Sequence, residues 1–428
     1  MSIDMETRLS RAAQVLDEHI ERPARAPSYL APAPRPSRRR PLLLSVGAFG
    51  CVMIAAAVMI STGGDTQQRT ITPGQTVPAG AEGWMTLPDA PISERAQGLV
   101  VSTGDGLFVW GGHDSDNKSD GAYLDMTTST WRKLPGAPLA GDRGDAIGVW
   151  TGHEVVVLNG VDDVRAAAFD PVAFTWRELP HPPLANAANA MNRAFFVDGA
   201  VIVIGVATEG EGKAPSQIAR LDLATSQWTT AGNNRLTEFG SFFEAASTGE
   251  EIIVAGHRPN MKDECGTILL AYRPSANTWR EISAGPAADR LDPMVVWTGS
   301  ELFVGGGRPC VNTAEPSATA HLLDPLTGQW RQAPDAPIGF EASMRYADLW
   351  TGKSVATINR DGTPLLFDPV ANQWHLGVTS PNGGLSSEST PLAWVAGSIV
   401  VWSGDRGDSK ACCNPIKGGE AYVPPPGF

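Results

Sequence analysis

The sequence predicts an all-β ring of seven four-stranded sheets, a β-propeller, preceded by one transmembrane helix and a short cytoplasmic helix. Three observations support this prediction. From residue 84 onward a tryptophan recurs at intervals of 44 to 52 residues, a period typical of propeller blades. Each interval holds two turn signals separated by apolar runs. A long apolar segment without charge precedes the first repeat.

The first turn signal leads into the strand that carries the tryptophan. Seven residues before each of the last six tryptophans stands an apolar residue, and Asp follows it in five of these six repeats, often with Pro next, as in Asp170-Pro171. Proline fixes φ and the carboxylate accepts hydrogen bonds from nearby amides, so this pattern predicts a tight turn between two strands. The tryptophans are Trp84, Trp131, Trp176, Trp228, Trp279, Trp330 and Trp374.

The second turn signal is a small dipeptide that ends in glycine, 20 to 23 residues after each tryptophan. An apolar or β-branched run follows it, which predicts a buried strand bounded by turns. Each repeat therefore contains four short strands. The dipeptides are Thr103-Gly104, Thr151-Gly152, Asp198-Gly199, Thr248-Gly249, Thr298-Gly299, Thr351-Gly352 and Ala396-Gly397.

The two ends of the repeat region complement one another. The last unit, Gly397 to Tyr422, lacks a tryptophan strand, whereas Gly83 to Pro88 has one and no unit before it. We expect the N-terminal strand to complete the last blade, because a closed ring leaves no sheet edge free to pair with other chains. The propeller domain is therefore predicted over residues 83–428.

These repeats resemble Kelch-repeat β-propellers over Gly83 to Tyr422. The resemblance is carried by the glycines after the second strand, the apolar anchor and the tryptophan seven residues later. The double glycine of that family is present at Gly111-Gly112 and within Gly305-Gly306-Gly307, and is reduced in the other repeats. The resemblance implies the fold and no particular activity.

The first 82 residues divide into three predicted segments. Residues 1–40 carry a net charge of +3 and contain an amphipathic helix over residues 5–20, then a proline-rich tether. Residues 41–62 form an apolar stretch long enough to span a membrane, preceded by Arg38-Arg39-Arg40. The positive-inside rule places the N-terminus in the cytoplasm and the propeller outside. Residues 63–82 are then a stalk. A cleaved signal peptide and a lipoprotein modified at Cys51 are the alternatives.

Charge and cysteine content indicate which classes of partner, cofactor and disulfide to expect. The total net charge of −13 leaves −16 on the chain beyond residue 40, which argues against nucleic acid as a partner. Arg outnumbers Lys 26 to 7, as in proteins from GC-rich bacteria. Without metal-type spacing or a cofactor motif, we expect neither a metal nor a cofactor. An oxidising compartment favours a Cys265–Cys310 disulfide, with Cys412 and Cys413 as a vicinal pair or bonded elsewhere.

Alignment on the glycine turns suggests a polar ligand site at the centre of the ring. Eight and six residues before each turn, polar side chains recur, and residues two apart on a strand share a face. We expect that face of the innermost strand to line the axial channel. Guanidinium groups at its mouth suit carboxylates or sugar hydroxyls, although mutual neutralisation around water is the other interpretation. The candidates are Arg95, Arg143, Asp145, Arg290, Asp292, Arg345 and Glu388, with Glu244, Glu341 and Glu388 as the only further acids that suit a general base.

The sequence therefore favours a membrane-anchored extracytoplasmic propeller that binds a protein, a peptide or a cell-envelope glycan through its long-loop face. An enzyme acting on an acidic sugar, as an epimerase or mutarotase, is the first alternative, because some bacterial Kelch propellers resemble sialic-acid epimerases. A transmembrane sensor whose helix at residues 5–20 binds a cytoplasmic protein is the second. No catalytic residue is assigned.

Overall fold

The computed structural model describes residues 82–139, 146–160, 164–184, 190–207, 216–232, 234–239, 243–257, 267–309, 315–340, 349–383, 391–402, 404 and 418–428. All of them belong to one compact unit, Thr66–Phe428. Within these residues the regular structure is almost entirely β, and the helical segments are two short 3-10 turns, η2 (Arg235–Glu238) and η3 (Gly285–Ala287).

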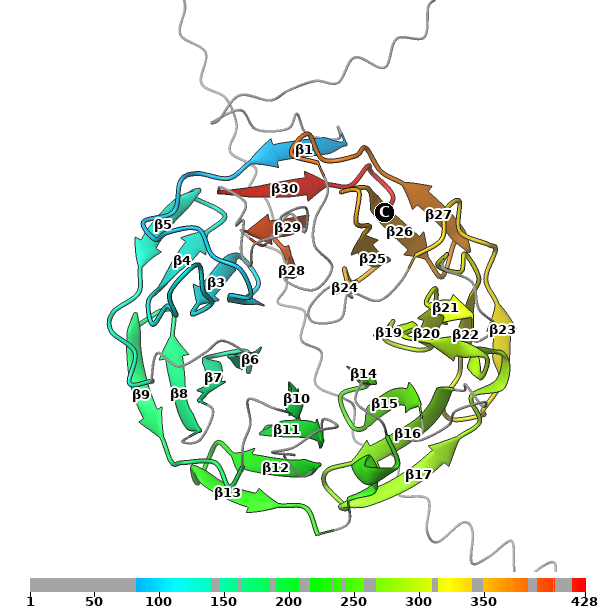
Figure 1. Ribbon diagram of the computed structural model, residues 1–428, viewed down its shortest axis with the longest axis horizontal. Helices are drawn as coiled ribbons and strands as arrows, with labels where there is room; N and C mark the ends of the chain where they lie inside the picture. Colours follow the sequence, from blue (N-terminus) through cyan, green and yellow to red (C-terminus); the bar gives the residue numbers. More distant parts are fainter. Residues whose placement is uncertain are drawn as a thin grey trace, which may run out of the picture. The chain divides into compact units, whose positions relative to one another are not determined.

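Seven four-stranded antiparallel sheets form the ring (Figure 1), as predicted. From the axis outward, blades 1 to 3 consist of β2 (Leu99–Ser102), β3 (Gly106–Trp110), β4 (Gly121–Asp125) and β5 (Thr130–Lys133); β6 (Ile147–Trp150), β7 (Val155–Asn159), β8 (Arg165–Asp170) and β9 (Thr175–Leu179); and β10 (Ala190–Val197), β11 (Ala200–Ala207), β12 (Gln217–Asp222) and β13 (Gln227–Thr230).

Blades 4 to 6 follow the same order. Their strands are β14 (Phe243–Ser247), β15 (Ile252–His257), β16 (Thr267–Arg273) and β17 (Thr278–Ile282); β19 (Met294–Trp297), β20 (Leu302–Gly305), β22 (Ala320–Leu323) and β23 (Trp330–Gln332); and β24 (Leu349–Trp350), β25 (Val355–Ile358), β26 (Pro364–Asp368) and β27 (Gln373–Leu376). Blade 5 also holds a two-stranded sheet of β18 (Arg290–Leu291) and β21 (Arg308–Pro309).

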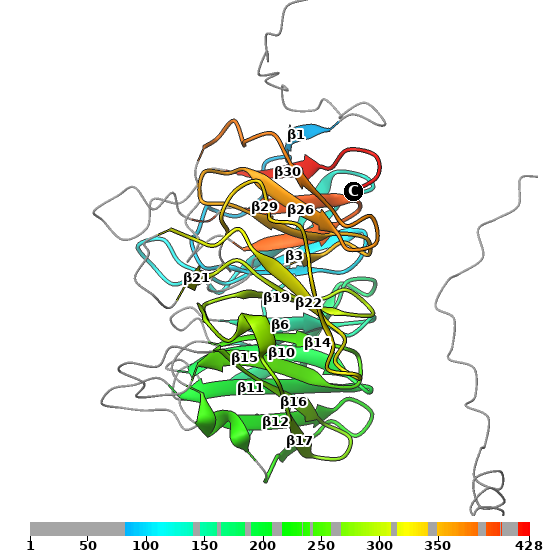
Figure 2. The same cartoon turned by 90° about the vertical axis from the view of Figure 1, so that its right-hand side faces the viewer.

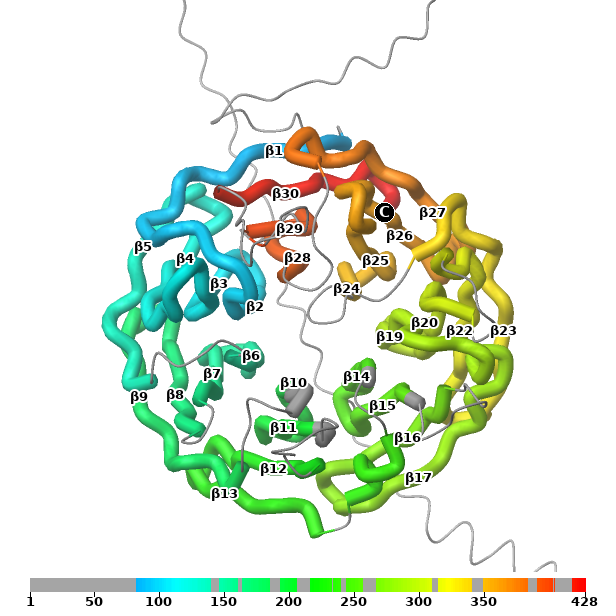
Figure 3. Tube along the Cα trace, in the orientation of Figure 1, coloured from blue at the N-terminus to red at the C-terminus, as the bar shows by residue number. Residues whose placement is uncertain are grey.

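Blade 7 joins the two ends of the described chain. It consists of β28 (Leu392–Val395), β29 (Ser398–Trp402), β30 (Gly419–Val423) and, outermost, β1 (Gly83–Thr86). β1 pairs antiparallel with β30, with Gly83 opposite Val423. The innermost strands contact one another in cyclic order from β2 through β28 and back to β2, and the chain runs once around the ring (Figure 3).

Antiparallel strands give the ring two different faces (Figure 2). The hairpin turns between the first and second strands and between the third and fourth strands lie on one face, called here the turn face. The connections between the second and third strands, and from each blade to the next, lie on the opposite loop face. Because β1 runs from Gly83 opposite the end of β30, the described chain enters the ring at the turn face.

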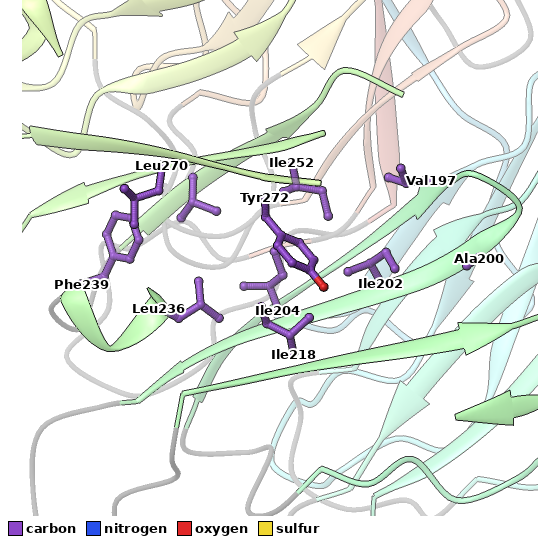
Figure 4. Packing of buried hydrophobic residues seen from close by; sticks show 11 residues of the cluster. Val197, Ala200, Ile202, Ile204, Ile218, Leu236, Phe239, Ile252, Leu270 and Tyr272 are labelled. Carbon is purple, nitrogen blue, oxygen red and sulfur yellow. The ribbon is translucent and has the colours of Figure 1, made fainter. Parts of the chain in front are cut away.

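The core lies between blades rather than within them. Each sheet buries both faces against its neighbours, so the second strands read as continuous apolar runs, for example Ile202 and Ile204 in β11. Between blades 3 and 4 these side chains meet Ile252, Leu270 and Tyr272 (Figure 4). Blades 1 and 2 similarly share the contacting, mutually tilted rings of Phe108, Phe169 and Trp176.

In six of the seven blades the recurring tryptophan fastens the blade to the one before it. The indole Nε1 of Trp374 donates to the carbonyl oxygen of Pro334 at 2.7 Å, and Trp131, Trp176, Trp228 and Trp330 make the same bond to the preceding blade. Trp84 donates to Val378 O at 2.6 Å and so links β1 to blade 6. These bonds explain why the spacing of tryptophans defines the repeat.

The predicted aspartate turns are confirmed. Asp170 Oδ1 accepts from the amides of Val172 and Ala173 at 2.8 and 2.9 Å. Equivalent pairs of bonds occur at Asp125, Asp222, Asp324 and Asp368. The carboxylate therefore caps two amides that the tight turn leaves unpaired.

A polar cluster surrounds the point where the described chain enters the ring. Glu82 Oε1 accepts from the Tyr422 hydroxyl at 2.5 Å and lies 3.0 Å from Nε2 of His375. Burial, followed by the neighbouring Glu82 carboxylate, raises the pKa of Tyr422. No helix in the described part of the chain is long and apolar enough to cross a membrane. The predicted segments 1–40 and 41–62 lie outside the described residues, as does the predicted stalk 63–82 apart from Glu82.

Candidate functional site

The structure describes three of the seven predicted ligand-binding residues: Arg95, Arg290 and Asp292. Arg143, Asp145, Arg345 and Glu388 lie outside the described residues, as do Glu341 and all four cysteines of the predicted disulfides, Cys265, Cys310, Cys412 and Cys413. The ligand-binding role of the seven residues and the disulfide pairing therefore stay predictions.

Arg95 and Arg290 occupy equivalent buried positions in blades 1 and 5. Arg95 Nη1 donates to the carbonyl oxygens of Gly111 and Asp120, both at 3.1 Å, and to Asp120 Oδ1 at 2.9 Å. Arg290 Nη1 donates to the carbonyl oxygens of Gly306 and Thr319 at 2.9 and 2.8 Å. Each guanidinium thus ties the end of the second strand to the residue just before the third strand.

The retained double glycines belong to the same local structure. Gly112 and Gly307 have φ of 85° and 70°, and a Cβ atom there would lie 2.7 Å from Ala96 O and 2.4 Å from Leu291 O. The close approach permits the bridge from Ala96 to His113 and the pairing of β18 with β21. In blades 1 and 5 the segment before the innermost strand lies against the connection between the second and third strands. The buried arginine and the double glycine occur together in these two blades because both permit this close contact.

The innermost strands do not present one face to the axis, and this expectation was wrong. Leu99 and Val101 of β2 pack against blade 2, whereas Val100 packs against blade 7. Both faces of the innermost strand are thus used for contacts between blades, so its edge borders the axis.

Two kinds of hairpin turn explain a one-residue error in the sequence alignment. In blade 1 the amide of Thr103 donates to Gly106 O, so the turn centres on Gly104 and Asp105, with positive φ at Gly104. In blade 3, Val197 pairs directly with Ala200, and both central residues, Asp198 and Gly199, have positive φ. Blade 7 repeats the second type at Ala396 and Gly397. The first type resembles type II′ turns and the second type I′ turns.

This difference moves the residues of blades 3 and 7 by one position relative to the other blades. When the strands are aligned on their paired residues instead of on the glycine, Arg193 rather than Ala194 corresponds to Glu244 of blade 4. In blade 7 the same correction puts Ser387 at the position that the first alignment gave to Glu388. Sequence reasoning therefore missed Arg193, although the dipeptides Asp198-Gly199 and Ala396-Gly397, with no threonine, were a visible signal of the other turn type.

Two ion pairs from three successive blades form the candidate site. Arg193 Nη2 of β10 lies 3.0 and 3.1 Å from Glu244 Oε1 and Oε2 of β14. In blade 5, Arg308 Nη2 lies 3.2 Å from Asp292 Oδ2. The side chains of Glu244, Arg193 and Asp292 are 14%, 19% and 23% exposed, so each is partly shielded from solvent. The site lies toward the loop-face ends of the innermost strands.

Electrostatics couples the two pairs. Burial raises the pKa of the Glu244 carboxyl above its ordinary value, the Arg193 guanidinium opposes this rise, and the Asp292 carboxylate adds to it. The influence of Asp292 means that the two carboxylates lie close enough to repel each other. Glu244 therefore keeps a proton to higher pH than an exposed glutamate does.

This arrangement has defined chemical capacities. The guanidinium of Arg193 can pair with a ligand carboxylate in place of Glu244, and the two carboxylates can accept hydrogen bonds from ligand hydroxyl or ammonium groups. A partly buried glutamate with a raised pKa is suited to proton transfer. Among the described residues no group of three or more His, Cys, Asp and Glu is placed to hold a metal ion.

Comparisons with known proteins do not assign a function to this chain. No family model matches the sequence, and no curated protein matches it. Among solved structures the chain is similar to the one titled "Structure of YjhT", with a TM-score of 0.47 and 15% sequence identity over 68% of this chain and 99% of that chain. The function of this chain therefore has to be argued from its own residues.

Proposed function

We propose that this chain is a membrane-anchored, extracytoplasmic propeller of the Kelch type that binds its ligand at the loop-face end of the ring axis. The observation that carries the proposal is the convergence of Arg193, Glu244, Asp292 and Arg308 from three successive blades. Partly buried charges of both signs at the centre of a rigid ring are typical of a site that recognises a polar ligand.

The chemistry of the site favours a ligand that carries a carboxylate and hydroxyl groups, as acidic glycans of the cell envelope do. A ligand carboxylate competes with Glu244 for the planar guanidinium of Arg193. Since Glu244 holds its proton more strongly than an exposed glutamate, protonation leaves Arg193 available to the ligand. We therefore expect acidic ligands to bind more tightly as the pH falls toward the range in which Glu244 is protonated.

A thermal-shift titration tests the proposal. The full chain in detergent is titrated with acidic saccharides, with their neutral counterparts and with acidic peptides, alongside the variants Arg193→Met and Glu244→Gln. A ligand at 100 times its dissociation constant stabilises by roughly 2.7 kcal/mol. Stabilisation by an acidic saccharide that disappears in Arg193→Met supports the site.

Arg177→Met is the matched control, because Arg177 forms an equivalent glutamate pair, with Glu154, on the turn face. Loss of the ligand effect in this control as well, or an equal effect of neutral and acidic ligands, contradicts the site at Arg193.

The second candidate function is turnover of an acidic sugar. It is favoured by one observation, the glutamate with a raised pKa beside a guanidinium that suits a sugar carboxylate. In that case Glu244 transfers the proton while Arg193 orients the substrate. Proton nuclear magnetic resonance of the anomeric signals of acidic sugars, with parent and Glu244→Gln, distinguishes the two functions: only an enzyme accelerates exchange between anomers or epimers.

A further inference from the structure

Large aliphatic side chains are exposed at one repeated position on the turn face. Val172, Leu326 and Val370 are 87%, 89% and 93% exposed, the highest values among the large hydrophobic residues that the structure describes. Each follows the Asp-Pro pair of the turn between the third and fourth strands. A single exposed aliphatic residue needs no explanation, whereas three at one structural position indicate a common use.

These three residues lie around the rim of the same face. Val172 belongs to the turn between β8 and β9, on the opposite side of the ring from the turns β22–β23 and β26–β27 that carry Leu326 and Val370 (Figure 1). Because the turns are equivalent in repeated blades, their tips lie at about the same height above the ring. A flat partner can touch all three at once, which a small ligand cannot.

Two surface pockets open beside two of these tips. One, of about 370 Å³, lies between blades 4 and 5 and is lined by Trp279, Arg280 and Leu326 among others. The second, of about 560 Å³, lies between blades 5 and 6 and includes Lys353 and Val370. Each pocket therefore combines an exposed aliphatic tip with a cationic group, a composition that suits the boundary between lipid tails and headgroups.

In four ion pairs of this face the carboxylate is more buried than its partner, so these pairs present guanidinium and ammonium groups to solvent although they are neutral overall. The exposed fractions of the side chains are 42% for Arg177 against 20% for Glu154, 40% for Arg280 against 11% for Glu251, 39% for Arg331 against 25% for Glu301, and 51% for Lys353 against 5% for Asp368. The pair of Arg273 with Glu250 differs, because its carboxylate is the more exposed member, at 74% against 44%.

Both ends of the described chain lie on this face beside blade 6. Glu82 Oε1 lies 3.0 Å from Nε2 of His375 in β27. The Lys353 ammonium donates to the carbonyl oxygen of Gly427. The predicted membrane segment 41–62 precedes Glu82 by a stalk of about 20 residues, which reaches at most about 70 Å when extended.

We propose that the turn face rests on the lipid bilayer, with Val172, Leu326 and Val370 entering the headgroup region and the outward cationic groups contacting lipid phosphates. The ligand site on the loop face then points away from the membrane. The inference goes beyond the proposed ligand binding, and it relies on the proposed membrane anchor only to keep this face close to the bilayer.

Vesicle binding tests the surface without the anchor. The unit Thr66–Phe428 holds all seven sheets and every described core cluster, and circular dichroism with tryptophan emission verifies its fold. It is sedimented with vesicles of phosphatidylcholine, alone or mixed with phosphatidylglycerol. We expect binding to both, stronger to the mixture and weaker at high salt. Binding to neither overturns the proposal.

Two variants make the test specific. The triple variant V172D/L326D/V370D should bind at least about tenfold more weakly, since each methylene withdrawn from the bilayer changes binding by a factor of about four. The variant A224L/S275L places leucine at the same turn position of blades 3 and 4, where the natural residues are small and exposed, and should bind more tightly. Circular dichroism and sedimentation without vesicles verify that this gain comes from a folded, unaggregated variant, because an exposed core would also bind vesicles or sediment by itself. Parent-like binding by both variants contradicts the proposal.

The membrane anchor is tested separately by carbonate extraction of membranes that contain the full chain. If carbonate extracts the full chain while Thr66–Phe428 binds vesicles, the proposed membrane anchor is contradicted and the proposed lipid-binding surface is supported. If the full chain stays in the membrane while Thr66–Phe428 does not bind vesicles, the anchor is supported and the lipid-binding surface is contradicted.

Discussion

At the scale of single residues, burial separates the arginines of the ring into two groups. Arg95 and Arg290 are buried and bond to backbone carbonyls, whereas Arg177 and Arg331 pair with glutamates at the surface. Burial lowers the pKa of Arg290, yet it remains charged at physiological pH because arginine titrates far above that range. Arg95 and Arg290 thus hold the connections between the second and third strands in place, and the exposed arginines add charge to the turn face.

Replacement of Arg290 by Met should lower the free energy of unfolding by about 2–4 kcal/mol, because the carbonyl oxygens of Gly306 and Thr319 lose a charged donor in a buried setting. Urea unfolding measures the change. The control Arg177→Met removes an exposed guanidinium and should cost about 1 kcal/mol or less. Equal effects of the two substitutions would falsify the structural role of Arg290.

Glu244 should make stability depend on pH in the direction opposite to most carboxylates. Its pKa is higher in the folded than in the unfolded chain, so between the two values the folded chain binds more protons. Stability is therefore highest below the unfolded pKa and falls as pH rises through the folded pKa. Glu244→Gln should remove this fall, measured as the difference in unfolding free energy between parent and variant from about pH 4 to 8. A parent curve that rises relative to the variant contradicts the assignment.

At the scale of the element, the choice of hairpin turn sets which residues of the innermost strand reach the axis. Both kinds of turn have two central residues, but glycine is the first of them at Gly104 and the second at Asp198-Gly199 and Ala396-Gly397. Counted back from the glycine, the strand residues are therefore displaced by one, and a shift of one residue reverses the face on which every side chain of a strand lies. Arg193 corresponds to Glu244 because each stands four residues before the last residue ahead of its turn, Val197 in blade 3 and Thr248 in blade 4.

Ala396 is strained by the turn that it occupies. Its φ of 47° lies in the left-handed region, which costs roughly 1–2 kcal/mol for most residues but is readily adopted by Asn. Ala396→Asn should therefore raise the free energy of unfolding by about 1 kcal/mol, as measured by urea unfolding. Ala224→Asn, at an exposed turn residue without positive φ, serves as the control and should be nearly neutral. Destabilisation by Ala396→Asn contradicts the assigned turn type.

At the scale of the whole molecule, the pairing of β1 with β30 makes the last blade depend on the N-terminal end of the propeller. Trp84 packs on Tyr422 with ring centroids 5.4 Å apart and donates to Val378 of blade 6. Glu82 adds bonds to Tyr422 and His375. One short segment thus contacts both blades that flank the entry point.

Two truncations test this dependence. Removal of residues 1–65 leaves all described contacts intact and should not change the midpoint of thermal unfolding. Removal of residues 1–86 deletes β1, exposes the edge of β30 and should lower the midpoint by about 5 °C or more, with a greater tendency to aggregate. Scanning calorimetry with light scattering measures both effects. Equal midpoints for the two fragments show that β1 does not hold the ring together.

The sequence by itself determined the fold class, the number of blades and the turn between the outer strands. Tryptophan spacing and the aspartate turns report interactions that are local or that recur in each repeat, such as the bond from Asp170 to Val172 or from Trp374 to Pro334. Because the same contact is made in nearly every blade, its sequence pattern is repeated often enough to be recognised without coordinates.

Only the tertiary structure decided which side chains meet at the axis. The Arg193–Glu244 pair joins two blades across 51 residues and occurs once, so no repetition marks it in the sequence. The use of both strand faces for contacts between blades, and the backbone bonds that bury Arg95 and Arg290, also depend on neighbours that sequence spacing does not specify. The candidate site is therefore a property of how unlike blades are placed side by side, rather than of the repeat they share.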